Sequence, residues 1–208
     1  MDTLALPRHL LTRFGPLGSL AILGELAMRL ARGEPFASLP PATTRAERDS
    51  RRQAAPAFVL YRVLTRRGVA DPFEETAAII ELAGVHFLRK ALGPLDPKTF
   101  AAMDGPARDR WVARLAAGFP NAEPDFEEVS ARRVRFRVHH CRFVTLAHQI
   151  GEPRLATLFC RADESYFGKV ERNVDLVRPH TLARGGPDCP FELRFVGSPD
   201  GESRGRPS

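Results

Sequence analysis

Residues 126–141, FEEVSARRVRFRVHHC, mark the point where the pattern of this chain changes. Three apolar residues, Val134, Phe136 and Val138, alternate with arginines and with His139 over the second half of this stretch. A period of two residues is typical of a strand with one buried face. We therefore expect one strand over residues 126–140, followed by a helix that begins near Cys141 and ends at Gly151.

The residues before this stretch have the apolar spacing of helices. Proline and glycine residues bound several of these segments, and Asp71-Pro72 has the form of a cap followed by a first-turn proline. Pro56 is expected to kink or split the second segment. The helices are expected over residues 19–32, 46–67, 72–93, 97–103 and 106–118.

The last third of the chain combines both patterns. Residues 153–170 have helical spacing, whereas residues 174–182 and 191–196 resemble strands joined by a Gly185-Gly186-Pro187-Asp188 turn. The fold class is therefore α+β, with a helical N-terminal half followed by a C-terminal antiparallel sheet with packed helices. We expect a helical region over residues 1–120 that forms one compact domain with an α+β region over 121–196. Residues 197–208 are expected to form a disordered tail.

Composition narrows the classes of partner. The 208 residues carry a formal charge of +6, but the arginines are dispersed and are not interleaved with aromatic stacking residues, which argues against nucleic acid. The apolar stretch over residues 17–30 is interrupted by Gly24, Glu25 and Arg29, so we expect no membrane span and a cytoplasmic location. A small molecule is the expected partner, and the oligomeric state stays open.

The most informative residues are three cysteines, Cys141, Cys160 and Cys189. An odd number in a chain without an export pattern favours free thiols or metal ligands over disulfides. Structural zinc sites usually bring ligands in close pairs, and the sequence has neither CxxC nor HxxxH. We therefore expect no metal and no cofactor.

Two of the cysteines have sequence neighbours that favour a catalytic role. Cys141 stands at an expected helix start, where unpaired amides favour a thiolate. Cys160 and Asp163 are three residues apart on an expected helix, so a thiol and a carboxylate share one face. The alternatives are structural: Cys141 closes a strand end, and Cys160 lies in the core while Asp163 is on the surface.

The remaining candidates lie near the last strand. Cys189 follows the glycine turn and precedes an alternating Phe-Glu-Leu-Arg-Phe segment, so it is either structural or part of a site. His180 is a candidate base, although a single strand histidine is more often a hydrogen-bonded packing residue. His139 and His140 point to opposite faces of a strand, so at most one of them faces a given site.

The order of these motifs resembles the L-2-amino-thiazoline-4-carboxylic acid hydrolase family. The resemblance is carried by the following segments: the strand ending in Cys141, Gly151-Glu152-Pro153, the segment Leu158-Phe159-Cys160-Arg161-Ala162-Asp163, the segment from Arg178-Pro179-His180-Thr181 to Gly185, and Cys189-Pro190-Phe191-Glu192-Leu193-Arg194-Phe195. It covers about residues 125–196, with a looser match in the helical half.

The resemblance implies hydrolytic opening of a cyclic amidine-like C=N bond in a small sulfur-containing amino acid, which gives a carbamoyl-cysteine. Cys141 or Cys160 would attack the ring carbon. Asp163 would bind the amidinium or relay a proton, and Arg178 would pair with the substrate carboxylate. The acid and base candidates are His180 and His139, and Thr181 and Cys189 complete the expected substrate site.

Two other functions fit the same residues. The closing strand-turn-strand is also similar to ligand-binding domains of vinyl-reductase-like and haem- or NO-sensing proteins, which bind hydrophobic or tetrapyrrole ligands. A biosynthetic tailoring enzyme on the same scaffold is the third possibility. An apolar cavity with all three thiols dry and Asp163 outside it would favour the binding module. Thiols that converge within about 5 Å of Asp163 or a histidine around a polar cavity would favour the hydrolase.

Overall fold

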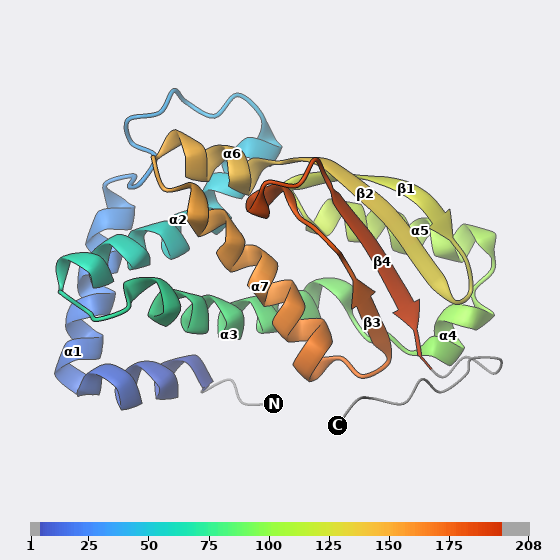
Figure 1. Cartoon of the computed structure of the whole chain (residues 1–208), viewed down its shortest axis with the longest axis horizontal. Helices are drawn as coiled ribbons and strands as arrows, with labels where there is room; N and C mark the ends of the chain where they lie inside the picture. The colour runs from blue at the N-terminus through green and yellow to red at the C-terminus, as the bar shows by residue number, and fades with distance from the viewer. Residues whose placement is uncertain (1–4, 197–208) are drawn as a thin grey trace.

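The computed structural model describes residues 5–196, so the expected tail over 197–208 lies outside the described residues. The described chain forms seven α-helices and a four-stranded sheet, which confirms the α+β class (Figure 1). The α-helices are α1 (Ala5–Ala31), α2 (Arg45–Arg66), α3 (Pro72–Leu92), α4 (Pro97–Ala102), α5 (Gly105–Gly118), α6 (Arg142–Gln149) and α7 (Thr157–Ser165). The strands are β1 (Ala122–Val129), β2 (Arg133–Cys141), β3 (Val174–Val177) and β4 (Cys189–Phe195).

Short polar residues begin several of the helices. The side chains of Thr44, Asp71, Asp96 and Asp104 each accept a hydrogen bond from the backbone N–H three residues later. Such caps satisfy amides that have no partner within the helix. Prolines follow the aspartates in α3, α4 and α5, where a missing N–H is tolerated. The expected starts of these helices are confirmed.

Two of the described helices, α1 and α2, contain a proline beyond the first turn, and the effect of this proline differs between them. The expectation was that Pro56 kinks or splits its helix; no split occurs, because α2 runs as one helix from Arg45 to Arg66. Ala54, Ala57 and Phe58 beside it are almost fully buried, and this packing outweighs the local preference of proline. The kink occurs instead in α1, where Gly15 adopts a φ of 66° directly before Pro16. Figure 1 shows the two parts of α1 running in different directions.

The stretch over residues 126–140 is a hairpin, which corrects the expectation of one strand. β1 and β2 pair in antiparallel fashion, with Val129 opposite Val134. The Ser130 N–H donates to the Arg133 carbonyl at 2.8 Å and closes the turn. The run Ser130-Ala131-Arg132 has no glycine or proline, so the turn carries no strong signal in the sequence.

The last two strands also differ in length from the expectation. The sheet order is β1-β2-β4-β3, with every neighbouring pair antiparallel. β3 ends at Val177 instead of continuing to residue 182, so Arg178 to Thr181 lie outside the sheet. A short 3₁₀ helix, η3 (Leu182–Arg184), then leads toward β4, which begins at Cys189. The expected antiparallel pairing of the last two segments is confirmed.

The two faces of the sheet have different chemistry. Cross-strand partners Val134 and Leu193, Phe136 and Phe191, and Val138 and Cys189 share the face that lines the interior. The other face carries arginine–carboxylate pairs. Arg133 contacts Glu128 and Glu192, and Arg137 contacts Glu127 and Asp188. The expected alternation of buried and charged residues along β2 is confirmed.

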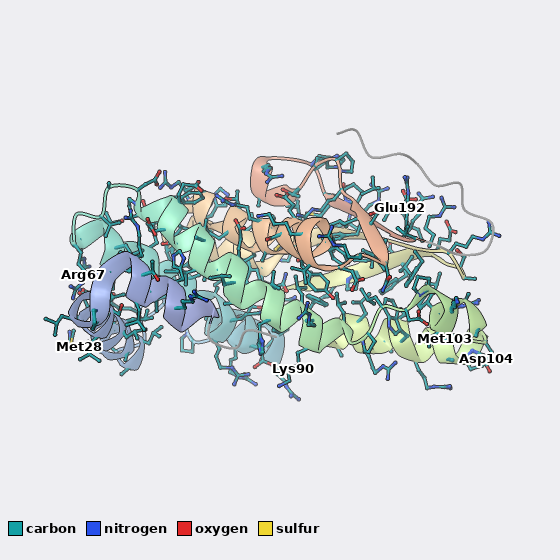
Figure 2. All side chains as sticks on the ribbon, turned by 90° about the horizontal axis from the view of Figure 1, so that it is seen from below. Met28, Arg67, Lys90, Met103, Asp104 and Glu192 are labelled. Atoms are coloured by element: carbon teal, nitrogen blue, oxygen red, sulfur yellow. The ribbon has the colours of Figure 1, made fainter. Side chains whose placement is uncertain are left out.

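The helices cover the apolar face of the sheet. In Figure 1, α7 crosses α3, and α5 lies behind β1 and β2. A π-helical turn, η2 (Tyr166–Val170), extends α7, while a 3₁₀ turn, η1 (Pro153–Ala156), precedes it. Figure 2 shows the elongated molecule from below, with Met28 and Arg67 at one end and Met103 and Asp104 at the other.

The first helix has an exposed apolar side. Leu10 and Ile22 are buried against α2 and α3, whereas Leu17 and Leu20 are 84% and 72% exposed. By length and composition, residues 8–31 are the one helix in the described chain that would reach across a membrane, which the sequence expectation for residues 17–30 did not anticipate. Core helices of soluble proteins and N-terminal signal sequences satisfy the same criterion.

Candidate active site

A cavity of about 270 Å³ lies between the apolar face of the sheet and helices α3, α5 and α7. Its volume is close to the lower end of the range for small-ligand pockets, ~300 Å³. Cys141, Cys160 and Cys189 all line it, together with Asp163 and Arg178. Five of the eight predicted site residues, which lie up to 48 positions apart in the sequence, therefore surround one space.

Cys141 occupies the N-cap position of α6, at the end of β2. Its side chain makes no capping hydrogen bond, so the sulfur remains available. Asn121 Nδ2 donates to the sulfur at 3.8 Å, and the Arg142 N–H donates to the Asn121 carbonyl at 2.7 Å. The thiol is half-buried. A negative charge on this sulfur would face the amide of Asn121 and the unpaired amides of the first turn of α6.

Cys160 lies within α7 and, like Cys141, is half-buried. Burial raises the pKa of the Cys160 thiol to about 12, and the positive charge of Arg178 opposes that rise only in part. The negative charges that Cys189 and Cys141 would carry also contribute to the rise, as expected for sulfurs around one cavity. Cys160 is therefore a neutral thiol at physiological pH.

Cys189 is the first residue of β4, opposite Val138 of β2. Its sulfur accepts a hydrogen bond from the Leu182 N–H at 3.1 Å. Burial raises the pKa of this thiol as well, and the Leu182 amide opposes the rise. The bond ties η3 to β4 and fixes one side of the cavity.

Asp163 and Arg178 form an ion pair at the cavity wall, in which the Arg178 side chain is buried and the Asp163 side chain is 23% exposed. Arg178 Nη1 donates to Asp163 Oδ2 at 2.7 Å, and its Nη2 donates to the Cys160 carbonyl at 2.9 Å. The guanidinium also lies over the ring of Phe191, and its side chain is only 3% exposed. Burial raises the pKa of the Asp163 carboxyl, and Arg178 opposes that shift.

Most of the donors of Arg178 are therefore occupied. The second contact of Nη2 is with Glu164 at 3.3 Å, so both ends of the guanidinium fork bind the protein. Arg178 Nε is buried and has no hydrogen-bond partner among the described residues. Of the five N–H donors, Nε–H and the second hydrogen of Nη1 have no partner in these contacts, so part of the guanidinium and not the whole fork is free to meet a ligand.

Three predicted site residues do not line the cavity. His139 is exposed on the charged side of β2. His180 Nε2 lies 2.8 Å from Asp188 Oδ1, and Arg137 binds the other oxygen of that carboxylate, so this histidine belongs to a surface network. Thr181 is fully buried, but its backbone carbonyl accepts the N–H groups of Arg184 and Gly186, which shapes the turn before β4.

Two amide side chains at the cavity, Asn121 and Gln53, were missed by the sequence interpretation. Asn121 precedes β1, and the pairing of Ala122 with Cys141 brings it to the reactive end of β2. Recognition of the hairpin would have placed it there. Gln53 comes from the middle of α2, and its position has no local sequence signal.

The donor set does not resemble a metal site. Within residues 5–196, no group of three or more His, Cys, Asp or Glu side chains is close enough to hold an ion. The three cysteines thus share the cavity without converging on one point. The chemistry available is that of thiols, amide donors and one ion pair.

Comparison with known proteins agrees with the motif order. Neither the curated proteins nor the solved structures include a significant match. The family model described as L-2-amino-thiazoline-4-carboxylic acid hydrolase matches residues 49–193. That range is more than half of the chain and includes every cavity-lining residue. The chain therefore belongs to the L-2-amino-thiazoline-4-carboxylic acid hydrolase family.

Proposed function

We propose that this protein adds water across the C=N bond of a 2-amino-thiazoline-type ring and opens the ring at its carbon–sulfur bond, through a cysteine thiolate. The observation that carries the proposal is the placement of three thiols and the Asp163–Arg178 pair around one cavity. Membership in a hydrolase family supports the reaction class. The specific bond and the covalent route are the proposed parts.

Cys141 is the proposed nucleophile. A nucleophilic cysteine must reach the thiolate form, and the raised pKa of about 12 disfavours Cys160. Cys189 is buried and its sulfur already accepts the Leu182 amide. Cys141 is half-buried, lines the cavity and lies beside the Asn121 amide and the start of α6. These groups would stabilise the charged sulfur and the charge that develops during attack.

The proposed reaction has two steps. The Cys141 sulfur attacks the carbon between the ring nitrogen and the ring sulfur, and the bond from that carbon to the ring sulfur breaks. The opened substrate is then bound to the enzyme as an isothiourea. Water attacks the same carbon and expels the Cys141 thiolate. The water oxygen becomes the carbonyl oxygen, and its two hydrogens go to the former ring nitrogen and the released sulfur.

The ion pair has a role in binding the polar part of the substrate. Among residues 5–196, Asp163 is the only carboxylate that lines the cavity, so it is the proposed acceptor for the amidine N–H groups. The free Nε of Arg178 provides one donor for an acceptor atom of the substrate. His139 and His180 lie too far toward the surface for direct contact in this arrangement, so they are not assigned a catalytic role.

The test is incubation of the protein with 2-amino-thiazoline-4-carboxylate and with 2-amino-thiazolines that lack the carboxylate, with detection of carbamoyl products by mass spectrometry. The wild type is expected to form product, and Cys141→Ala is expected to be folded and inactive. Cys160→Ala is the matched control and is expected to retain turnover. No product from any of these compounds would contradict the proposed reaction.

One observation favours a second candidate, a non-catalytic module for hydrophobic ligands. The cavity wall is mostly apolar, although Asp163 belongs to it. Haemin titration followed by absorbance would reveal tetrapyrrole binding. A tailoring enzyme with the same nucleophile would act on a larger thiazoline, and the product assay would detect it when such compounds are supplied.

A further inference from the structure

We infer that the substrate carries an uncharged hydrophobic group, such as an aryl or branched alkyl substituent, next to the cyclic amidine. This inference rests on the proposed function, because it concerns the same cavity. It differs from the small charged amino acid that the family name describes.

The cavity wall offers little to a charged substrate. Its charged side chains are Asp163 and Arg178, and these bind each other at 2.7 Å. Gln53, Asn121 and the three thiols are its other polar side chains, and all of them are uncharged as ordinary side chains. The carboxylate of an amino-acid ligand would lose its hydration here, and among the described lining residues it would find no positive charge that is free of a partner.

The polar groups gather at one end of the cavity. Cys189 and Cys141 lie at the edge where β4 begins and β2 ends, whereas Leu193 lies four residues further along β4, or about 13 Å away. On the opposite wall, Cys160 and Phe167 are seven residues apart, or about 10 Å along a helix. The end remote from the cysteines is formed by Leu88, Leu92, Leu115, Phe119, Phe167 and Leu193.

The entrance is apolar as well. Phe87 lines the cavity and is nevertheless 37% exposed, and Ala83, one turn earlier in α3, is exposed too. The ring of Phe87 packs edge to face against Phe119, with 6.0 Å between the centroids. An exposed phenylalanine that packs on a half-buried one beside an apolar interior is the arrangement expected for an entering hydrophobic ligand.

The hydrophobic group and the cyclic amidine would thus occupy different ends of the same space. The amidine would lie near Cys141 and Asp163, while the substituent would contact the phenylalanine and leucine side chains between α3 and α5. Burial of a group the size of a phenyl ring contributes about 2 kcal/mol, or roughly thirtyfold in affinity. The charged carboxylate at that position would contribute nothing comparable.

The experiment compares three compounds that share the reacting ring: 2-amino-2-thiazoline, its 4-carboxylate and its 4-benzyl derivative. Dissociation constants are measured by isothermal titration calorimetry with the Cys141→Ala variant, and kcat/KM is measured with the wild type. The benzyl compound is expected to bind at least tenfold more tightly than the carboxylate. Equal or weaker binding of the benzyl compound overturns the inference.

The two proposals fail in different ways. Tight binding of the benzyl compound without turnover of any compound would contradict the hydrolysis and leave the ligand class standing. Turnover with preference for the carboxylate would support the hydrolysis and overturn the hydrophobic group. Failure of all three compounds to bind would overturn the inference as well.

Variants of Phe87 test whether this side chain contacts the hydrophobic group of the ligand. Phe87→Ala is expected to weaken binding of the benzyl compound about five- to thirtyfold and to change binding of unsubstituted 2-amino-2-thiazoline by less than about twofold. Phe87→Leu is expected to restore most of the affinity. Leu20→Ala on the exposed side of α1 is the control and is expected to change neither constant. Equal losses for both compounds in Phe87→Ala would overturn the assignment.

Discussion

At the residue scale, the three cysteines share a cavity but differ in their local chemistry. Cys141 lies beside an amide side chain at a helix start, Cys160 is a neutral thiol because burial raises its pKa to about 12, and Cys189 accepts a backbone N–H. Similar residues in one space can thus have distinct roles. The differences arise from burial and from the donors around each sulfur.

These differences predict the order of alkylation. At pH 8, a thiol with a pKa of about 12 is ionised in roughly one molecule in ten thousand, so Cys160 is expected to react slowly with iodoacetamide. Cys141 is expected to be modified before Cys160 and Cys189. Peptide mapping by mass spectrometry during a time course measures the order. Modification of Cys160 ahead of Cys141 in folded protein would contradict the assignment of the nucleophile.

The Asp163–Arg178 ion pair predicts a stability that depends on pH. Arg178→Leu leaves the Asp163 carboxylate without its partner, and at pH 8 the loss of unfolding free energy is expected to be about 3 kcal/mol. Burial already raises the pKa of Asp163 in the folded protein, and removal of Arg178 raises it further. The folded variant therefore binds a proton more readily than the unfolded chain, so its stability increases as the pH falls.

Urea unfolding at pH 8 and pH 5.5 measures this effect. The difference in the free energy of unfolding between wild type and Arg178→Leu is expected to be smaller at pH 5.5 than at pH 8. Arg184→Leu provides a matched control, because Arg184 also binds Glu164 but is 50% exposed. Arg184→Leu is expected to lower the free energy of unfolding by less than about 1 kcal/mol at both pH values. A difference for Arg178→Leu that is the same at both pH values would argue against a buried carboxylate.

At the element scale, the cavity depends on the close approach of α3 and α7. Gly84 of α3 faces Ala162 of α7, and a Cβ added at Gly84 would lie only 2.4 Å from the Ala162 Cβ. A side chain at Gly84 would therefore force the two helices apart. Since Cys160 and Asp163 belong to α7, such a shift would also displace site residues.

Gly84→Ala is expected to lower the free energy of unfolding by about 1–3 kcal/mol, because the new methyl group overlaps Ala162. Gly24→Ala is the matched control, since this helical glycine has no atom within 4 Å of an added Cβ. The free energy of unfolding of Gly24→Ala is expected to be about 0.5–1 kcal/mol higher than that of the wild type, because alanine lowers the chain entropy of the unfolded state. Chemical denaturation followed by circular dichroism compares them, and equal effects would contradict the close packing of α3 on α7.

The sequence predicts the starts of helices better than it predicts the turn between two strands. Helix starts at Asp71, Asp96 and Asp104 are visible because capping is a local interaction. The turn between β1 and β2 was missed because Ser130-Ala131-Arg132 contains no turn-specific residue. That one error hid Asn121, which is brought to Cys141 only by strand pairing. The cysteines were identified from residue type and order, but their ionisation depends on burial, which has no local sequence pattern.

At the scale of the whole molecule, the helical region and the sheet form a common core. Leu88 and Trp111 from the helices belong to the same buried cluster as Val134 and Leu193 from the strands. The cavity also takes its walls from both regions. Residues that pack in one core are expected to unfold together.

Differential scanning calorimetry tests this expectation. One transition is expected over the full chain, with equal calorimetric and van't Hoff enthalpies. The substitution Trp111→Ala, on α5, is expected to shift this single transition to lower temperature without splitting it, since Trp111 lies in the common core. Two resolved transitions would show that the helical and sheet regions are separate domains.

The central claim is covalent catalysis by Cys141, and a mass measurement of the trapped intermediate tests it most directly. The protein is mixed with a 2-amino-thiazoline substrate, quenched with acid during turnover and digested for peptide mapping. Ring opening on the sulfur loses no atoms, so the account predicts a mass increase equal to the whole substrate on the peptide that contains Cys141, and no such adduct in Cys141→Ala. Product formation by Cys141→Ala at the wild-type rate, or an adduct on Cys160 or Cys189 instead, would contradict it.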